Sequence, residues 1–260
     1  MRLGLGIAAG PDPKPLEDLA RQAEDLGYDS IWCNDHPGGE GLLQLAAWAQ
    51  ASRHLQLGVG VMALDRHRTE EIAARVQQLE LPVDRLLLGL GAGFTKTPLG
   101  VVREGVESLR AALPGVRVAV AAMGPRMCEL AGEIGDAVLL NWMTPARAAW
   151  ARPLVEAGTK RTGRESTDVR IFGYVRTALG ADGADRLRRE SETYFQMPHY
   201  RRHFDQMGAE PASVGVATAD PSGVADGINR YRALDEPVVR VLSHRDIGDI
   251  LAVARAAVGA

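Results

Sequence analysis

Short apolar runs alternate with longer amphipathic segments along almost the whole chain. The runs consist largely of Val, Leu, Ile, Ala and Gly. Their length and composition predict strands, several of them buried on both faces as in a parallel sheet. The predicted strands cover residues 2–7, 29–33, 55–63, 85–91, 118–122, 136–140, 169–179 and 237–242.

The segments between these runs repeat apolar residues three and four positions apart, which predicts helices with one buried face. The predicted helices cover residues 16–26, 42–49, 69–79, 102–113, 125–134, a segment that starts at 144, a long region at 184–207 that is interrupted near 198, and further helices at 224–234 and 247–258. Pro153 should kink or divide the helix that starts at 144, because proline removes a hydrogen bond from a helix.

Eight strands that alternate with helices over this length favour one (β/α)8 TIM barrel domain, covering residues 1–260. A doubly wound open sheet is the alternative. It is weakened because Gly4, Gly6 and Gly10 do not have the spacing of a dinucleotide-binding loop.

Residues 118–144 form a complete strand–loop–helix–strand unit. Pro125 suits the first position of its helix, where free N–H groups, the helix dipole and Arg126 could hold a phosphate. A plain turn with a solvated arginine is the alternative. Asn141 and Trp142 follow the second strand of the unit, at the end where α/β proteins bind ligands. They indicate either a polar handle beside an aromatic wall or a buried tryptophan bonded to the backbone.

Other strand ends also carry candidate chemistry. Asp35 and His36 either face a ligand at the barrel mouth or form a hydrogen-bonded loop pair. The glycine-rich segment 89–93 either clears a planar ring or allows tight packing, and it lacks the lysine of a Walker loop. Gly58 and Gly60 should let a backbone or a flat ligand come close to the strand at 55–63.

The remaining polar residues give weaker signals. His199 and His203 have a spacing that could hold a metal, but no HExxH pattern or nearby acid supports one, so we predict no metal site and favour a lid or wall of the mouth. Cys33 lies in an apolar strand, which favours an inert core thiol over a nucleophile. Three further histidines have no context that distinguishes them from surface residues: His54, His67 and His244.

The composition narrows the class of partner. The chain is 46% hydrophobic and 24% charged, with a net charge of −3. This charge gives no general attraction to nucleic acid or to an anionic membrane. Two cysteines do not make a disulfide framework, and no apolar run approaches the ~18 residues of a membrane-spanning helix. We therefore expect a cytoplasmic protein whose partner is a small molecule.

Three segments together resemble the luciferase-like monooxygenase family in order and spacing: LGYDSIWCNDH, RLLLGLGAGF and AAMGPRMCELAGEIGDAVLLNWMTP. The resemblance is clearest over residues 1–144 and thinner afterwards. The third segment is the most specific. It looks most like the branch that uses the deazaflavin coenzyme F420, rather than the branch that uses FMN.

The resemblance implies a flavin-type ring in the mouth of the barrel, supported by a non-prolyl cis peptide bond near residues 61–63. It also implies that the phosphate side of the cofactor reaches residues 122–127. The implied cofactor contacts are Asp35, Met62, Ala63, Gly91, Ala92, Gly93, Ala122, Met123, Gly124, Arg126, Met127, Asn141 and Trp142. The expected substrate pocket is apolar and is formed by Leu64, Phe94 and Phe195 beside this tryptophan.

The sequence also departs from the family pattern. Asp35 matches a cofactor-contacting acid, and His36 matches the proton-donating histidine of F420-dependent dehydrogenases. Those enzymes have tryptophan and glutamate where this chain has Glu40 and Phe94. Relatives also carry an insertion between the fourth helix and the fifth strand that helps to cover the mouth, whereas residues 113–116 join these elements directly here. We therefore expect an open mouth, or one completed by the second subunit of a homodimer.

The resulting interpretation is an oxidoreductase that transfers a hydride between coenzyme F420 and a small, apolar organic substrate, with His36 as the catalytic residue. One alternative is an FMN-dependent monooxygenase that uses O2. The other is a flavin- or deazaflavin-binding protein without turnover, which the missing tryptophan and glutamate would suit.

Overall fold

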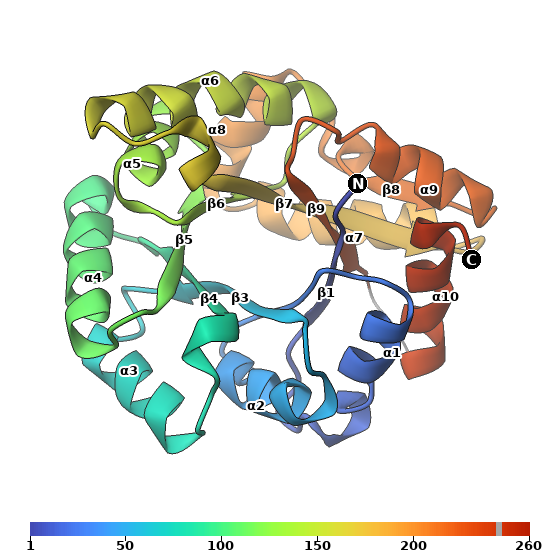
Figure 1. Ribbon diagram of the computed structural model, residues 1–260. Coiled ribbons are helices and arrows are strands. Elements are labelled where there is room, and N and C mark those ends of the chain that lie inside the picture. Colours follow the sequence, from blue (N-terminus) through green and yellow to red (C-terminus); the bar gives the residue numbers. More distant parts are fainter. Residues whose placement is uncertain (243–245) are drawn as a thin grey trace.

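Eight parallel strands close into a barrel in the computed structural model, which describes residues 1–242 and 246–260 (Figure 1). Consecutive strands pair from β1 to β7, β7 pairs with β9, and β9 pairs with β1. The barrel strands are β1 (Gly4–Ala8), β2 (Ser30–Asn34), β3 (Gln56–Ala63), β4 (Leu86–Gly91), β5 (Arg117–Ala122), β6 (Ala137–Asn141), β7 (Arg170–Leu179) and β9 (Glu236–Val241). The predicted (β/α)8 barrel is confirmed. His244 lies outside the described residues.

Helices surround the barrel and alternate with its strands (Figure 1). They are α1 (Leu19–Asp25), α2 (Gly41–Ala51), α3 (Thr69–Gln78), α4 (Pro98–Ala112), α5 (Pro125–Ile134), α6 (Pro145–Arg161), α7 (Gly183–Phe195), α8 (Pro198–Met207), α9 (Ser222–Asn229) and α10 (Ile247–Val258). The predicted interruption near residue 198 is confirmed, since α7 and α8 are separate helices.

Two local predictions differ from the structure. A short strand, β8 (Val216–Thr218), pairs with the last residues of β7 in a segment that we expected to be irregular. Pro153 does not divide α6, which is a single helix over Pro145–Arg161. Proline has no N–H to donate to the carbonyl of Ala149, four residues earlier in the helix. Ala149 is exposed, so water can hydrogen-bond this carbonyl instead.

Aromatic and branched side chains fill the inside of the barrel, around Trp32, Phe172 and Tyr174. A Cβ atom at Gly58 would overlap the indole ring of Trp32, and one at Gly60 would overlap the side chain of Tyr174. The prediction that these glycines admit a backbone or a flat ligand is therefore wrong, because they make room for core rings.

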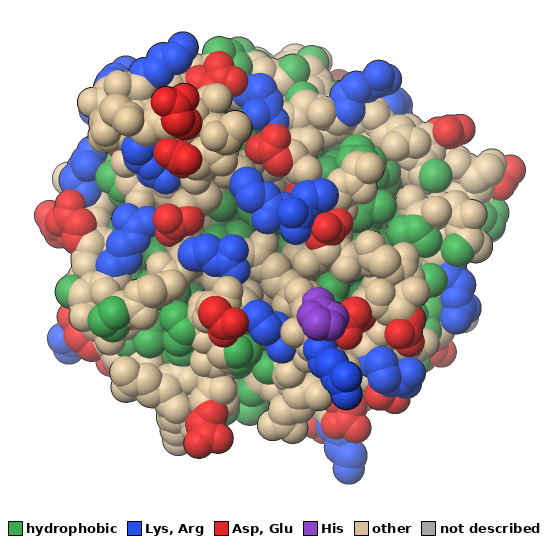
Figure 2. All heavy atoms as spheres, viewed as in Figure 1, with side chains coloured by type: hydrophobic (Ala, Val, Ile, Leu, Met, Phe, Trp, Pro, Cys, Tyr) green, Lys and Arg blue, Asp and Glu red, His purple; other side chains and the backbone are tan. Residues whose placement is uncertain are grey.

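The end of the barrel at which the strands begin is closed by an ionic network. Glu236 is fully buried and pairs with Arg170 and with Arg2, at 3.3 Å from the latter's Nε. Burial raises the pKa of Glu236, and the two arginines oppose this effect. Figure 2 shows this face, with Lys and Arg side chains near its centre.

The connection from α4 to β5 is as short as predicted, since α4 ends at Ala112 and β5 begins at Arg117. It lies at the same end as the ionic network, because a helix-to-strand connection returns to the end where strands begin. The expectation that its shortness opens the mouth is therefore wrong. The short connection therefore does not support a homodimer, which stays a prediction based on the resemblance to the family.

Gly58→Ala should lower the free energy of unfolding by at least about 2 kcal/mol, because its methyl group overlaps Trp32 in a filled interior. Gly100→Ala is the matched control. This exposed position in α4 has no atom within 4 Å of the added Cβ, and alanine should stabilise the helix by up to about 1 kcal/mol. Urea unfolding checks both. Equal stability of the two variants would contradict the packing described for Trp32.

Candidate functional site

The mouth of the barrel lies at the carboxyl ends of the strands, and β3 is irregular there. The register between β3 and β4 shifts between Val59 and Met62, and the Gly60–Val61 peptide bond is cis. The expected cis bond near residues 61–63 is therefore confirmed. Met62 is buried, and Ala63 is half-buried.

The loop after β4 turns at Gly93, whose φ of +62° favours glycine. Asp65 accepts a hydrogen bond from the backbone N–H of Phe94 at 2.9 Å, which ties this loop to the loop after β3. Phe94 is 74% exposed, and its ring centre lies 5.2 Å from that of His199 on α8. Leu64 packs against α4, where a Cβ at Gly105 would approach it to 2.6 Å.

A cleft of about 470 Å3 lies at the rim and is lined by loops that follow β1, β2 and β3. Asp35 lies in it and accepts hydrogen bonds from His67 Nε2 at 2.8 Å, Arg66 at 3.3 Å and Gly41 N–H at 3.4 Å. Glu40, which replaces the family's tryptophan, pairs with an arginine of α3 at 2.9 Å. His67 thus joins the site, although its sequence context did not distinguish it from a surface residue.

The two ring nitrogens of His36 both contact the backbone. Nε2 lies 2.8 Å from the carbonyl oxygen of Ala9, and Nδ1 accepts from Gly38 N–H at 3.1 Å. A carbonyl only accepts, so Nε2 carries the hydrogen and Nδ1 presents its lone pair. His36 is therefore the neutral Nε2–H tautomer in this arrangement.

The floor of the mouth consists of polar side chains at the ends of β2, β6, β7 and β9. Asn34 accepts from Arg240 Nε at 2.5 Å and donates to the carbonyl of Gly60 at 2.6 Å. Asn141 accepts from Arg176 and donates to the hydroxyl of Tyr200 at 3.1 Å. The amide of Asn141 thus joins β7 to α8, its role toward a cofactor stays a prediction, and the two arginines were missed.

Trp142 is fully buried rather than part of an open wall. Its φ of +47° is unusual for a bulky residue, and its carbonyl accepts from His203 Nε2 at 2.7 Å. The guanidinium of Arg176 lies 4.1 Å from the centre of its ring. Phe195 packs against Phe204, 6.1 Å between ring centres, in the aromatic cluster that α7 and α8 form over this tryptophan.

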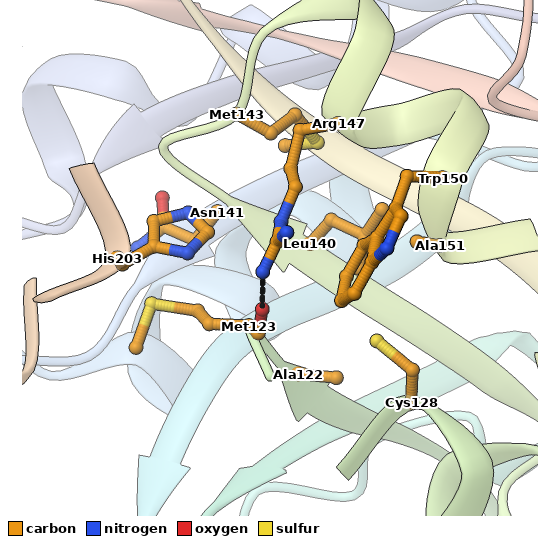
Figure 3. Close-up of a pocket in the computed structure, with 10 residues that line it drawn as sticks. All are labelled: Ala122, Met123, Cys128, Leu140, Asn141, Met143, Arg147, Trp150, Ala151 and His203. Carbon is orange, nitrogen blue, oxygen red and sulfur yellow. Dashed lines mark hydrogen bonds between the residues drawn. The ribbon is translucent and has the colours of Figure 1, made fainter. Parts of the chain in front are cut away.

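The predicted phosphate side lies between the starts of α5 and α6 (Figure 3). Ala122 and Met123 line a gap of about 10 Å3 there, enough for about one water molecule. Gly124 is the N-cap of α5 and has no side-chain cap, Arg126 is exposed, and Met127 packs against the core.

Arg147 occupies this gap, and no sequence motif indicated it. Figure 3 shows its guanidinium between the rings of His203 and Trp150, pointing to the carbonyl of Met123, to which it donates at 3.2 Å. Among the described residues, Arg147 pairs with no acid, and Arg147 Nε and His203 Nδ1 are buried without hydrogen-bond partners. Burial lowers the pKa of both side chains. Arg147 Nε is an N–H donor, whereas His203 donates through Nε2 to the carbonyl of Trp142, so that its Nδ1 presents a lone pair. Arg147 Nε can therefore bond an oxygen atom of a ligand or of water, and His203 Nδ1 can accept a hydrogen bond.

Neither a metal cluster nor a membrane span occurs within residues 1–242 and 246–260. No group of three or more His, Cys, Asp or Glu side chains there could hold a metal ion, and no helix there is long and apolar enough to cross a bilayer.

A family model for luciferase-like monooxygenases matches residues 1–108 and 98–237. The chain belongs to this family. Its curated relatives include 5,10-methylenetetrahydromethanopterin reductases from Methanolobus tindarius, 26% identical over 71% of this chain and 67% of the relative, and from Archaeoglobus fulgidus, 27% identical over 68% and 64%. The chain thus spans about two thirds of the length of these relatives.

Solved structures of this family share the fold. The coenzyme F420-dependent tetrahydromethanopterin reductase from Methanopyrus kandleri superposes with a TM-score of 0.74 at 19% identity, over 98% of this chain and 97% of that one. An F420-dependent secondary alcohol dehydrogenase gives 0.77 at 16% identity, over 99% of each chain. A monooxygenase from Streptomyces bottropensis gives 0.72 at 18% identity, over 100% of this chain and 98% of that one.

The two thiols should resist alkylation in the folded protein. Cys33 and Cys128 are fully buried, and burial raises the pKa of both, that of Cys128 to about 12. Iodoacetamide at pH 8 should therefore label neither within an hour, as followed by mass spectrometry, and should label both in urea. Rapid labelling of Cys33 in the folded state would contradict an inert core thiol.

Proposed function

We propose that this chain is an oxidoreductase that transfers a hydride between coenzyme F420 and a small organic substrate. Two kinds of support converge. Relatives in sequence and structure include enzymes described as F420-dependent. Arg147 is the observation that carries the proposal. Its guanidinium lies near the start of α5 and, among the described residues, pairs with no acid and has a buried Nε without a hydrogen-bond partner, so that it suits the phosphate of such a cofactor.

In the proposed enzyme, F420 when bound supplies the hydride chemistry. Arg147 and the first N–H groups of α5 would hold its phosphate, and Gly91–Gly93 and the β3 irregularity would border its ring. Arg126 is exposed and therefore less suited than Arg147 to bind this phosphate. The other proposed cofactor contacts keep the roles that the resemblance to the family implies. A cytoplasmic location and a homodimer belong to the same proposal.

His36 remains the proposed proton donor. Its neutral tautomer must first be protonated at Nδ1, which breaks the bond from Gly38 N–H. Protonated His36 can then release a proton to the substrate. Asp35 and His67 lie beside it in the same cleft and can return the proton from solvent.

An FMN-dependent monooxygenase is the second candidate, favoured by monooxygenases of similar fold. A binding protein without turnover is the third. Glu40 and Phe94 motivate it, since both stand exposed at the rim in place of the family's tryptophan and glutamate. The substrate was expected to be apolar, but Leu64 and Phe195 pack against neighbouring helices rather than define a pocket among the described residues.

Titration with F420 and with FMN, followed by fluorescence, distinguishes the cofactors. We expect F420 to bind, and Arg147→Met to weaken binding at least about tenfold through loss of a charge-assisted contact. Arg126→Met is the matched comparison and should change binding less, because its side chain is exposed. Binding of FMN alone would contradict the proposal, and binding of neither would contradict any flavin-type cofactor.

His36→Gln should leave F420 affinity within about tenfold and slow the oxidation of reduced F420 by a panel of enones and imines by ~10²-fold or more. His67→Gln is the control, and it should slow turnover much less, because Asp35 keeps its bond to Arg66. If His67→Gln slows turnover and His36→Gln does not, His36 is not the proton donor. If F420 binds but wild type turns over nothing in the panel, the binding protein without turnover is favoured.

A further inference from the structure

Two arginines lie side by side on the floor of the mouth. Arg176 on β7 and Arg240 on β9 are partners in the sheet register and are 2% and 7% exposed. The stem of Arg240 passes over β1, where a Cβ at Gly6 would lie 3.5 Å from its Cδ. Both side chains therefore belong to the inside of the barrel, at its open end.

Their hydrogen bonds leave one end of each guanidinium free. Arg176 bonds through Nε to Glu190 at 3.3 Å and through Nη1 to Asn141. Arg240 bonds through Nε to Asn34 and through Nη1 to the carbonyl of Val241. Within the part of the chain that the structure describes, no acceptor is bonded to Nη2 of either arginine. Two N–H-rich groups thus remain available on neighbouring strands.

The positive charge of this floor exceeds the negative charge beside it. Glu190 is the one carboxylate, among the described residues, that pairs with either arginine. Burial lowers the pKa of Arg240, and the nearby positive charge of Arg176 lowers it further. The negative charge of Glu190 raises the pKa of Arg240 and so opposes both effects. The other neighbours are neutral, since burial raises the pKa of Tyr200 to about 12 and raises that of Tyr174 as well. A buried charge without a counter-ion is costly, so the floor favours an anion.

The opposite end of β7 offers a comparison within the same strand. Arg170, at its start, pairs with the buried carboxylate of Glu236. Among the described residues, the closed end therefore gives its arginines a fully buried carboxylate, whereas the two arginines of the open end share the single, partly exposed carboxylate of Glu190. The proposed phosphate site does not account for this, because Arg147 and His203 lie on the β5–β6 side of the mouth.

We propose that Arg176 and Arg240 bind a carboxylate of the substrate, so that the substrate is a small organic acid. This proposal rests on the proposed function, and it replaces a purely apolar substrate with an anionic one. Two Nη2 groups from neighbouring strands suit the two oxygens of a planar carboxylate. Tyr194, whose ring centre lies 5.3 Å from the guanidinium of Arg176, and Tyr200 would flank the organic part.

Ligand-observed NMR titration of the cofactor-free protein tests this directly, with benzoate as the probe and benzamide as its neutral isostere. We expect benzoate to bind at least about tenfold more tightly than benzamide. Inorganic sulfate should compete only weakly. Equal binding of benzoate and benzamide would overturn the proposal, and sulfate binding as tight as that of benzoate would overturn the carboxylate assignment.

Variants assign the binding to the two arginines. Arg240→Met should weaken benzoate binding at least about tenfold, and Arg240→Lys should weaken it less, because it keeps the charge and loses the fork. Glu190→Gln should tighten binding severalfold, because it removes the competing carboxylate, a change that a purely structural role would not produce. Arg117→Met is the matched control at the closed end and should have no effect.

Melting curves should confirm that each variant is folded. If Arg240→Met is unfolded, Arg240→Lys and Glu190→Gln still test the proposal. Weaker benzoate binding by Arg240→Lys together with tighter benzoate binding by Glu190→Gln would support it. Unchanged benzoate affinity in folded Arg240→Met or in Glu190→Gln would overturn it. The benzoate titration needs no cofactor, so the two proposals can fail separately. If F420 binds but benzoate does not, the carboxylate site is wrong and the proposed function stands. If benzoate binds but F420 does not, the proposed function is wrong and the carboxylate site stands.

Discussion

Three aromatic rings packed against one another fill the middle of the barrel. Trp32 lies 5.1 Å from Phe172 and 6.1 Å from Tyr174 between ring centres, and glycines of β3 make room for two of these rings. This apolar layer separates two polar layers. Below it, Glu236 neutralises arginines in a closed network. Above it, the Nη2 groups of Arg176 and Arg240 have no partner among the described residues and lie at the mouth.

The open end divides into sides with different chemistry. The cleft after β2 and β3 holds histidines and Asp35, which suit proton transfer. The gap between α5 and α6 holds Arg147, whose guanidinium suits a phosphate. The strand ends of β7 and β9 hold the paired arginines. In the proposed enzyme, a cofactor placed across the first two sides leaves the third for the substrate. Glu40 and Phe94, the departures from the family pattern, lie at the rim rather than on this floor.

The sequence predicted the barrel because apolar periodicity reports which elements form and in what order. It also located the strand ends, and thereby Asp35 and Asn141. It could not predict that Arg176 and Arg240 are neighbours, since this depends on β7 pairing with β9 past the intervening β8 and α9. The sequence signal for these two residues was the presence of an arginine within each apolar run.

Arg147 was missed for another reason. It occupies an ordinary helical position of α6, and only the packing of α6 against α5 brings it to the start of α5. The glycines of β3 were misread because sequence shows where a side chain is absent, but not which ring fills the space. In each case the missing information was tertiary packing.

A crystal structure of the protein with F420 tests the central claim most directly. We expect a phosphate oxygen within hydrogen-bonding distance of the guanidinium of Arg147, the ring beside the Gly60–Val61 bond, and the floor arginines uncovered by the phosphate. A phosphate bound instead by Arg176 and Arg240, with Arg147 Nε still without a partner, would contradict the proposed binding mode.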